Sequence, residues 1–234
     1  MRLLNTTTLE LEIHNDNNLK YAILSHTWGE DEILLEDVLP GGNWRIKRGA
    51  HKSSSAELSE AINSMFLWYA ESEVCYAFIS DAKKGTPLTG CRWFTRGWTL
   101  QELIASKRVE FYDENWEHLG DRMSLIDESV SMPYYDSSLE SLLESYTVSR
   151  RMSWESNHST QREEDGAYSL MGLFGVKMPL LYGEGWRAFR RLQEEIIKES
   201  NDQSILAYYQ QHLTSNISRL FPSAPSIFTS LMED

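Results

Sequence analysis

A tryptophan and a glutamate lie four residues apart in the stretch RGWTLQEL, at Trp98 and Glu102. Residues at positions i and i+4 share one face of an α-helix, so both side chains can line the same wall of a cleft. A carboxylate placed there can stabilise positive charge that develops on a bound substrate. The alternative is structural: Trp98 packs in the core, and Glu102 is solvated or pairs with Arg92 or Arg96. The residues alone leave both interpretations open.

A second group of polar and aromatic side chains ends the stretch KYAILSHTW, at Ser25, His26 and Trp28. The apolar run before them predicts a buried strand over residues 20–25. In α/β proteins, ligands bind beyond the carboxyl ends of such strands, so these residues are candidates for polar contacts and a stacking surface. Neighbours on a strand point to opposite faces, and Ser25 and His26 are therefore not a nucleophile and base pair by adjacency.

Other apparent motifs fit their chemistry poorly. The stretch GEGWRA at 183–188 matches G-x-G-x-x-A. However, Pro179 disfavours a central strand before it, and Glu184 puts a carboxylate where a pyrophosphate must approach. The six histidines lack the short spacings of a metal site, so no metal is expected. The formal net charge of -13 repels nucleic acid, and one basic stretch, WRIKRGAHK, does not offset it.

Composition predicts a soluble cytoplasmic protein with one core. The two cysteines, Cys75 and Cys91, cannot build a disulfide framework and match no zinc or redox spacing, which favours a reducing compartment. No segment reaches the roughly 18 apolar residues that span a bilayer, and the first residues lack the apolar core of a signal peptide. A chain of 234 residues with 41% hydrophobic content suffices for one domain.

The elements that position the candidate residues alternate between helix and strand. Apolar spacing predicts a helix over residues 53–72, with Ser54 and Glu57 as its capping box. The elements that follow have the order of a parallel α/β sheet: a strand over 74–80, a helix over 95–106 and a strand over 107–113.

From residue 119 onward the pattern is helical. The clearest segment is an amphipathic helix in EGWRAFRRLQEEIIKES, which carries Trp186, Phe189, Leu192 and Ile196 on one face. The second half is therefore expected to form a helical layer.

Five blocks of the sequence resemble, in order, those of the fungal heterokaryon incompatibility (HET) domain. They are YAILSHTWG, SAELSEAINSMFLWY, RWFTRGWTLQELIAS, RMSWESNHSTQREEDGAYSLMGLF and MPLLYGEGWRAFRRLQEEIIKES. The resemblance implies a fungal intracellular protein of non-self recognition whose activation triggers programmed cell death. It places the HET domain over 1–212, with an α/β part to about 118, a helical part from about 119, and a tail over 213–234. The partners it implies are a NOD-like receptor, another incompatibility protein or a second copy of the chain.

A more distant resemblance supplies a mechanism. YAILSHTWGEDE looks like the first strand and loop of TIR domains, and RGWTLQEL looks like their helix that carries a tryptophan and then a glutamate. This implies a TIR-like (flavodoxin-like), mostly parallel sheet with flanking helices and a C-terminal helical layer. In the TIR enzymes that cleave NAD⁺, that glutamate is catalytic, and the matching position is Glu102.

The same resemblance makes NAD⁺ the substrate, not a bound cofactor, with contacts to Ser25, His26, Trp28 and Trp98. Two other functions remain open at this point. One is a non-catalytic module that signals by self-association, and the other is a small-molecule enzyme on a HET scaffold.

One block of the HET pattern is absent. Before the SAELSEAIN helix, family members usually carry a further helix and strand, whereas this chain has GGNWRIKRGAHKSSS. The resemblance therefore implies a sheet that lacks one central strand and has an exposed edge. A natural short paralogue and a mispredicted exon both explain the difference.

Overall fold

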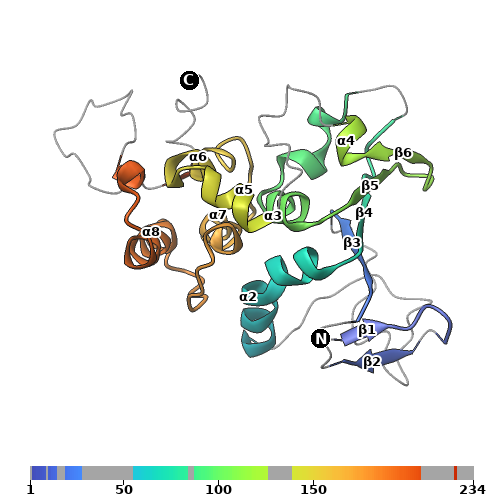
Figure 1. The fold of residues 1–234 in the computed structure, drawn as a ribbon, viewed down its shortest axis with the longest axis horizontal. Coiled ribbons are helices and arrows are strands. Elements are labelled where there is room, and N and C mark those ends of the chain that lie inside the picture. The colour runs from blue at the N-terminus through green and yellow to red at the C-terminus, as the bar shows by residue number, and fades with distance from the viewer. Residues whose placement is uncertain are drawn as a thin grey trace.

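The computed structural model describes residues 2–8, 10–14, 19–27, 55–83, 87–125, 139–206 and 224–225. The candidate contact residue Trp28 and the predicted capping residue Ser54 lie outside these ranges, as do the basic stretch and the predicted tail residues 213–223 and 226–234. Figure 1 shows a sheet on one side of the molecule and a group of helices on the other.

A four-stranded mixed sheet forms the first part of the fold. The strands are, in spatial order, β3 (Ala22–His26), β4 (Val74–Phe78), β5 (Val109–Tyr112) and β6 (His118–Asp121). The first three pair in parallel and match the three predicted strands. β6 is antiparallel to β5. The sheet is thus α/β in character, but it contains a strand where the sequence predicted the helical part to begin.

The turn between β5 and β6 explains this difference. The Oδ1 atom of Asp113 accepts hydrogen bonds from the backbone N–H groups of Asn115 and Glu117, both at 2.9 Å. An aspartate that binds the backbone two residues ahead reverses the chain, so the next residues return along β5. A four-residue strand without regular alternation gives little sequence signal.

A small hairpin at the N-terminus was also missed from the sequence. β1 (Arg2–Leu4) and β2 (Leu11–Ile13) form a separate antiparallel pair. The Asn5 side chain accepts hydrogen bonds from the N–H groups of Thr7 and Thr8 and so shapes the turn between them.

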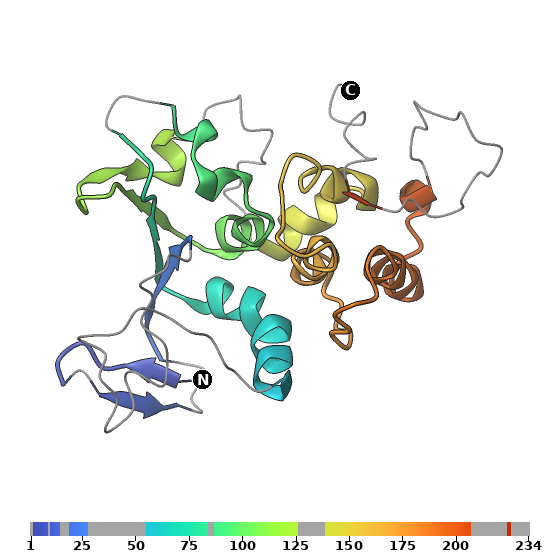
Figure 2. The ribbon, with the colours of Figure 1, turned by 180° about the vertical axis from the view of Figure 1, so that it is seen from behind.

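Two helices cover one face of the main sheet. They are α2 (Ser55–Glu71) and α3 (Gly97–Ala105), both within predicted helical segments. Two short 3-10 helices, Leu88–Gly90 and Arg92–Thr95, precede α3. The core between these helices and the sheet includes Tyr69, Cys75, Ala77, Trp93, Leu103, Val109 and Phe111. Figures 1 and 2 both show α2 and α3 on the same side of β4 and β5.

The remaining described residues form the helical part. Its elements are α4 (Arg122–Leu125), α5 (Leu139–Ser145), α6 (Val148–Ser153), α7 (Asp165–Tyr168), a 3-10 helix (Met171–Phe174), α8 (Arg187–Glu199) and a 3-10 helix (Gln203–Leu206). A second core cluster lies among the elements from α5 onward and includes Met152, Trp154, Tyr168, Leu173, Phe189 and Leu192, whereas Leu125 of α4 packs against the core of the sheet.

The predicted apolar face of α8 is confirmed with one correction. Phe189, Leu192 and Ile196 are buried, as expected. Trp186, however, lies at the position before the helix and is only partly buried. Ala188 shares the buried face instead, because the helix begins at Arg187 and its first turn presents the small side chain inward.

Candidate active site

The Glu102 carboxyl is buried against the carboxyl-terminal half of β3. Ser25, the fourth residue of β3, donates a hydrogen bond from Oγ to Oε2 of Glu102. The exposed fractions are 1% for Ser25 and 8% for Glu102. Both residues were candidates from the sequence, and the structure brings them into direct contact although 77 positions separate them.

Local structure explains why these two side chains meet. Side chains alternate along a strand, so Ser25 faces the core while Leu24 beside it is 47% exposed. Glu102 lies in the middle of α3, which packs on the same face of the sheet. The start of α3 is fixed by Thr99, whose single hydroxyl proton is shared between the backbone oxygens of Trp93 at 2.5 Å and Arg96 at 2.7 Å.

Two aromatic side chains complete the hydrogen-bond network. The indole Nε1–H of Trp93 donates to Oγ of Ser25 at 2.6 Å. The hydroxyl of Tyr69, on α2, donates to the backbone oxygen of Leu24 at 3.4 Å and also interacts with the Glu102 carboxyl. Neither residue was predicted from the sequence to be a member of the site. The available signal was that a buried Trp or Tyr needs a partner for its polar atom, but the sequence does not say which partner.

Burial controls the protonation of this group. It raises the pKa of Glu102 to about 7, while the hydrogen bonds from Ser25 and Tyr69 and the positive charge of Arg96 act in the opposite direction. Burial, followed by the charge of Glu102, also raises the pKa of Cys75 to about 12. A carboxyl that titrates near neutrality can exchange a proton with a substrate or, once ionised, stabilise a developing cation.

The other sequence candidates have different surroundings. His26 follows Ser25 on β3, and strand alternation places it on the opposite face of the sheet. Trp98 packs against the core of the helical part and hydrogen-bonds to Asp165. Trp98 and Glu102 therefore face different partners, although one helical turn separates them.

A second buried carboxyl contacts the start of α3 from the helical part. Glu155 is 3% exposed, and its Oε1 atom accepts a hydrogen bond from Oγ of Ser169 at 3.2 Å. Among the described residues, none hydrogen-bonds to its Oε2 atom. Burial raises the pKa of Glu155 to about 8. Sequence analysis gave this residue no role.

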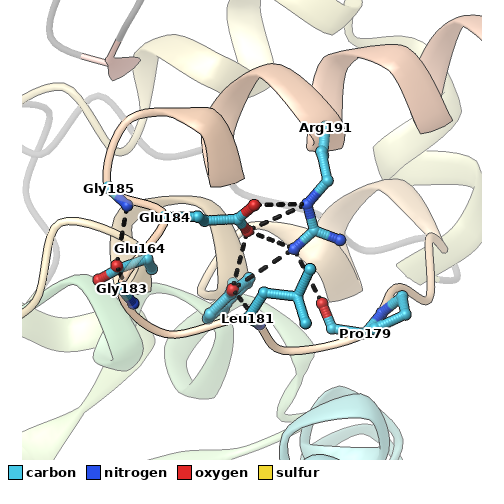
Figure 3. A network of polar contacts seen from close by, with 8 residues as sticks. Glu164, Pro179, Leu181, Gly183, Glu184, Gly185 and Arg191 are labelled. Carbon is cyan, nitrogen blue, oxygen red and sulfur yellow. Dashed lines mark hydrogen bonds and ion pairs between the residues drawn. The ribbon is translucent and has the colours of Figure 1, made fainter.

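The glycine loop before α8 binds a carboxylate of the chain itself. Oε1 of Glu164 accepts hydrogen bonds from the N–H groups of Gly183 at 2.7 Å and Gly185 at 2.9 Å (Figure 3). The φ angles of these glycines are 99° and 60°, a region that favours glycine. Because Glu164 uses both amides, they do not face a ligand phosphate here.

Ionic and polar contacts hold the rest of this loop. Nε of Arg191, on α8, donates to the two carboxylate oxygens of Glu184 at 3.0 and 3.1 Å. Its Nη2 atom donates to the backbone oxygen of Pro179 at 2.9 Å, and the Tyr168 hydroxyl accepts from the N–H of Leu181 at 2.8 Å (Figure 3). The GEGWRA stretch is therefore a structural loop that fixes the start of α8.

The described residues show neither a metal-binding group nor a membrane-spanning helix. Within those ranges, no three or more His, Cys, Asp or Glu side chains are grouped so that they could hold a metal ion. In the same part of the chain, no helix has the length and apolar character needed to cross a membrane.

Comparison with known proteins supports an incompatibility-type chain. It is 41% identical over 224 residues to "Vegetative incompatibility protein HET-E-1" of Podospora anserina, a match that covers 76% of this chain and 16% of that protein. Residues 187–229 match a family model described as a domain of unknown function (DUF8212). No solved structure matches the chain. The relative supports the HET-type prediction and a fungal origin, while the likeness to TIR domains stays a prediction.

Proposed function

We propose that this chain acts in fungal non-self recognition and programmed cell death, and that Glu102 is the catalytic carboxylate of an NAD⁺-cleaving site. The name of the related protein supports the incompatibility role. One observation carries the enzymatic part: a buried carboxyl with a raised pKa is hydrogen-bonded at the carboxyl-terminal half of a parallel strand. Titratable groups perturbed in this way cluster at functional sites.

The proposed reaction breaks the bond between the ribose and the nicotinamide ring. The bonding electrons move to the nicotinamide nitrogen, and positive charge develops on the ribose as in glycoside hydrolysis. Ionised Glu102 stabilises that charge, and a water molecule then adds to the ribose carbon and loses one proton to solvent. Burial strengthens the interaction because the surroundings of the carboxylate have a low dielectric constant.

The contact between Ser25 and Glu102 fits this role. A ribose hydroxyl is the same kind of donor as the Ser25 hydroxyl, so it can replace Ser25 on the carboxylate when the substrate enters. Trp93 donates to Ser25 from the other side and positions it. Since the reaction needs ionised Glu102, turnover is expected to rise with pH through about 7.

The test is the release of nicotinamide by purified protein at high concentration, measured by chromatography. We expect Glu102→Gln to lower turnover by about a hundredfold or more, because it removes the negative charge and keeps the shape. Glu155→Gln is the matched control: it also neutralises a buried carboxyl with a raised pKa, and it should retain turnover. Equal rates for Glu102→Gln and the unchanged protein would disprove the catalytic assignment.

A non-catalytic signalling module is the second candidate. It is favoured by the way the Glu102 carboxyl is satisfied internally, with Ser25 and Tyr69 as partners and only 8% of the residue exposed. A polar cluster of this kind also holds a helix on a sheet. Light scattering separates the two functions, because assembly without nicotinamide release supports the module.

A further inference from the structure

The main sheet presents an aromatic surface on the face opposite α2 and α3. On the covered face, Cys75, Ala77, Val109 and Phe111 are at most 1% exposed. Alternation places Tyr76 and Phe78 of β4 and Tyr112 of β5 on the other face. Tyr76 is 37% exposed, and Trp116 in the turn after β5 is 53% exposed. Among the described helices, those that pack on this sheet do so on its covered face.

Four of these rings form a continuous row, called here the aromatic row: Tyr76, Tyr112, Trp116 and Phe78. Phe78 and Trp116 are stacked, with ring centroids 4.8 Å apart. Tyr112 lies 5.8 Å from Trp116 and 5.8 Å from Tyr76. Each ring supports the next, so the row is ordered before any partner binds, and little conformational entropy remains to be lost on binding.

The backbone holds Trp116 in an uncommon conformation. Its φ angle is 59°, in the left-handed region that large side chains rarely adopt. The turn enforces this angle, since the N–H of Trp116 donates to the backbone oxygen of Asp113 at 3.0 Å and the Asp113 side chain binds two further amides. The result is a large aromatic side chain kept half in solvent. Conformations of this kind concentrate at functional positions.

The surroundings of the aromatic row are acidic. Residues 108–121 contain five carboxylates and one arginine: Glu110, Asp113, Glu114, Glu117, Asp121 and Arg108. Arg108 and His118 both contact the Glu110 carboxylate, at 2.6 and 2.5 Å, so the arginine is already paired. Glu114 and Glu117 are exposed beside Trp116 in the sequence.

We propose that the aromatic row binds an arginine- or lysine-rich segment of a protein partner. Cationic side chains pack over Trp and Tyr rings, and their methylene groups lie along the apolar faces of those rings. The nearby carboxylates complement the positive charge. The net charge of -13 opposes the other occupants, since nucleic acid and a second copy of the chain both bring negative charge to an acidic rim.

The probe is a fluorescein-labelled nona-arginine peptide, with fluorescence anisotropy measured at near-physiological salt. We expect Trp116→Ala to weaken binding by about tenfold or more while the charge of the protein stays the same. Glu114→Gln should also weaken binding. Glu199→Gln removes the same charge from the exposed end of α8, at the opposite end of the molecule from β6, and should leave the affinity unchanged (Figure 1).

Two controls keep the result unambiguous. The same peptide with citrulline in place of arginine loses its charge and should not bind. Trp116→Asn removes the ring with a residue that tolerates a left-handed backbone, so it tests the surface even if Trp116→Ala does not fold. Unchanged affinity in a folded Trp116 variant would overturn the proposal, because the peptide would then bind by non-specific charge attraction and not through the aromatic row. A dimer that dissociates when Trp116 is replaced would overturn it as well, since a second copy would occupy the surface.

Discussion

Hydrogen bonds and a nearby positive charge offset part of the free-energy cost of burying Glu102. Moving a carboxylate out of water is costly unless other groups replace the lost solvation. Here the Ser25 and Tyr69 hydroxyls and the charge of Arg96 supply part of that replacement, and the pKa of Glu102 still rises to about 7. The group is therefore divided between its two protonation states near neutral pH, which suits a catalytic carboxyl.

At the same scale, Gly97 sets how closely α3 approaches the helical part. A Cβ atom at this position would lie 2.4 Å from Oε1 of Glu155 and 2.6 Å from Cγ2 of Thr160. We expect Gly97→Ala to lower the free energy of unfolding by about 1 to 3 kcal/mol, because both neighbours are packed and must move. Thermal or urea denaturation measures the change.

Gly90→Ala is the matched control for this substitution. A Cβ atom at Gly90 meets nothing within 4 Å, so its stability should stay near that of the unchanged protein. If Gly97→Ala is as stable as Gly90→Ala, then the contact between Glu155 and α3 is looser than the structure shows.

Single residues differ in how far the sequence predicts their place. Ser25 and Glu102 were expected to share a site through the resemblance to TIR domains, since the residues alone left a structural role for Glu102 open. Trp93 and Tyr69 were missed because their partners come from distant parts of the chain, and local patterning carries no information about which atoms meet. Trp98 illustrates the same limit, since its spacing from Glu102 did not reveal that it contacts Asp165.

Among the elements, α8 was predictable because its apolar side chains recur with the helical period. Phe189 is 2% exposed and lies in the core of the helical part. We expect Phe189→Ala to lower the free energy of unfolding by about 3 to 5 kcal/mol, since the truncation leaves a cavity in packed surroundings. Arg190→Ala, on the exposed side of the same helix, is the control and should have little effect. Unchanged melting of Phe189→Ala would show that α8 is peripheral.

Short elements were the ones that sequence reasoning could not find. β1, β2 and β6 have three, three and four residues, too few for a periodic pattern to appear. Their positions depend on turns built by Asn5 and Asp113. The loop before α8 is similar: Pro179 and Glu184 argued against dinucleotide binding by its glycines, but only the fold shows that Glu164 occupies their amides.

At the scale of the whole molecule, β3 is the first strand of the main sheet among the described residues. The resemblance to the HET domain implied that one central strand and a helix are absent, with an exposed edge of the sheet as the consequence if the absent strand lies beside the first one. The match of 224 residues to the related protein covers 76% of this chain. Leu24 on β3 is 47% exposed, because it lies on the face of the sheet opposite Ser25.

The buried carboxyls also make the free energy of unfolding of the whole molecule depend on pH. Burial raises the pKa of Glu102 from an ordinary 4.5 to about 7 and that of Glu155 from 4.5 to about 8. Between the ordinary and the raised pKa of each carboxyl, the folded chain binds more protons than the unfolded chain, so the free energy of unfolding decreases as pH rises. His158 acts in the opposite direction, because burial lowers its pKa below the ordinary 6.5. Because the two carboxyls lower the free energy of unfolding and only one imidazole raises it, the free energy of unfolding falls overall as pH rises above about 5.

We therefore expect the melting temperature to fall between about pH 5 and pH 8. The fall should persist in 0.5 M salt, because salt screens repulsion among surface charges but does not remove the cost of burying a carboxylate. Glu102 alone contributes on the order of 3 kcal/mol to this loss, a large share of a total stability of about 5 to 15 kcal/mol. Glu102→Gln and Glu155→Gln should each flatten the profile and melt above the unchanged protein at pH 8. A flat profile in the unchanged protein, or Gln variants that keep the full slope, would show that these carboxyls are solvated and that the two cores are more open than the structure describes.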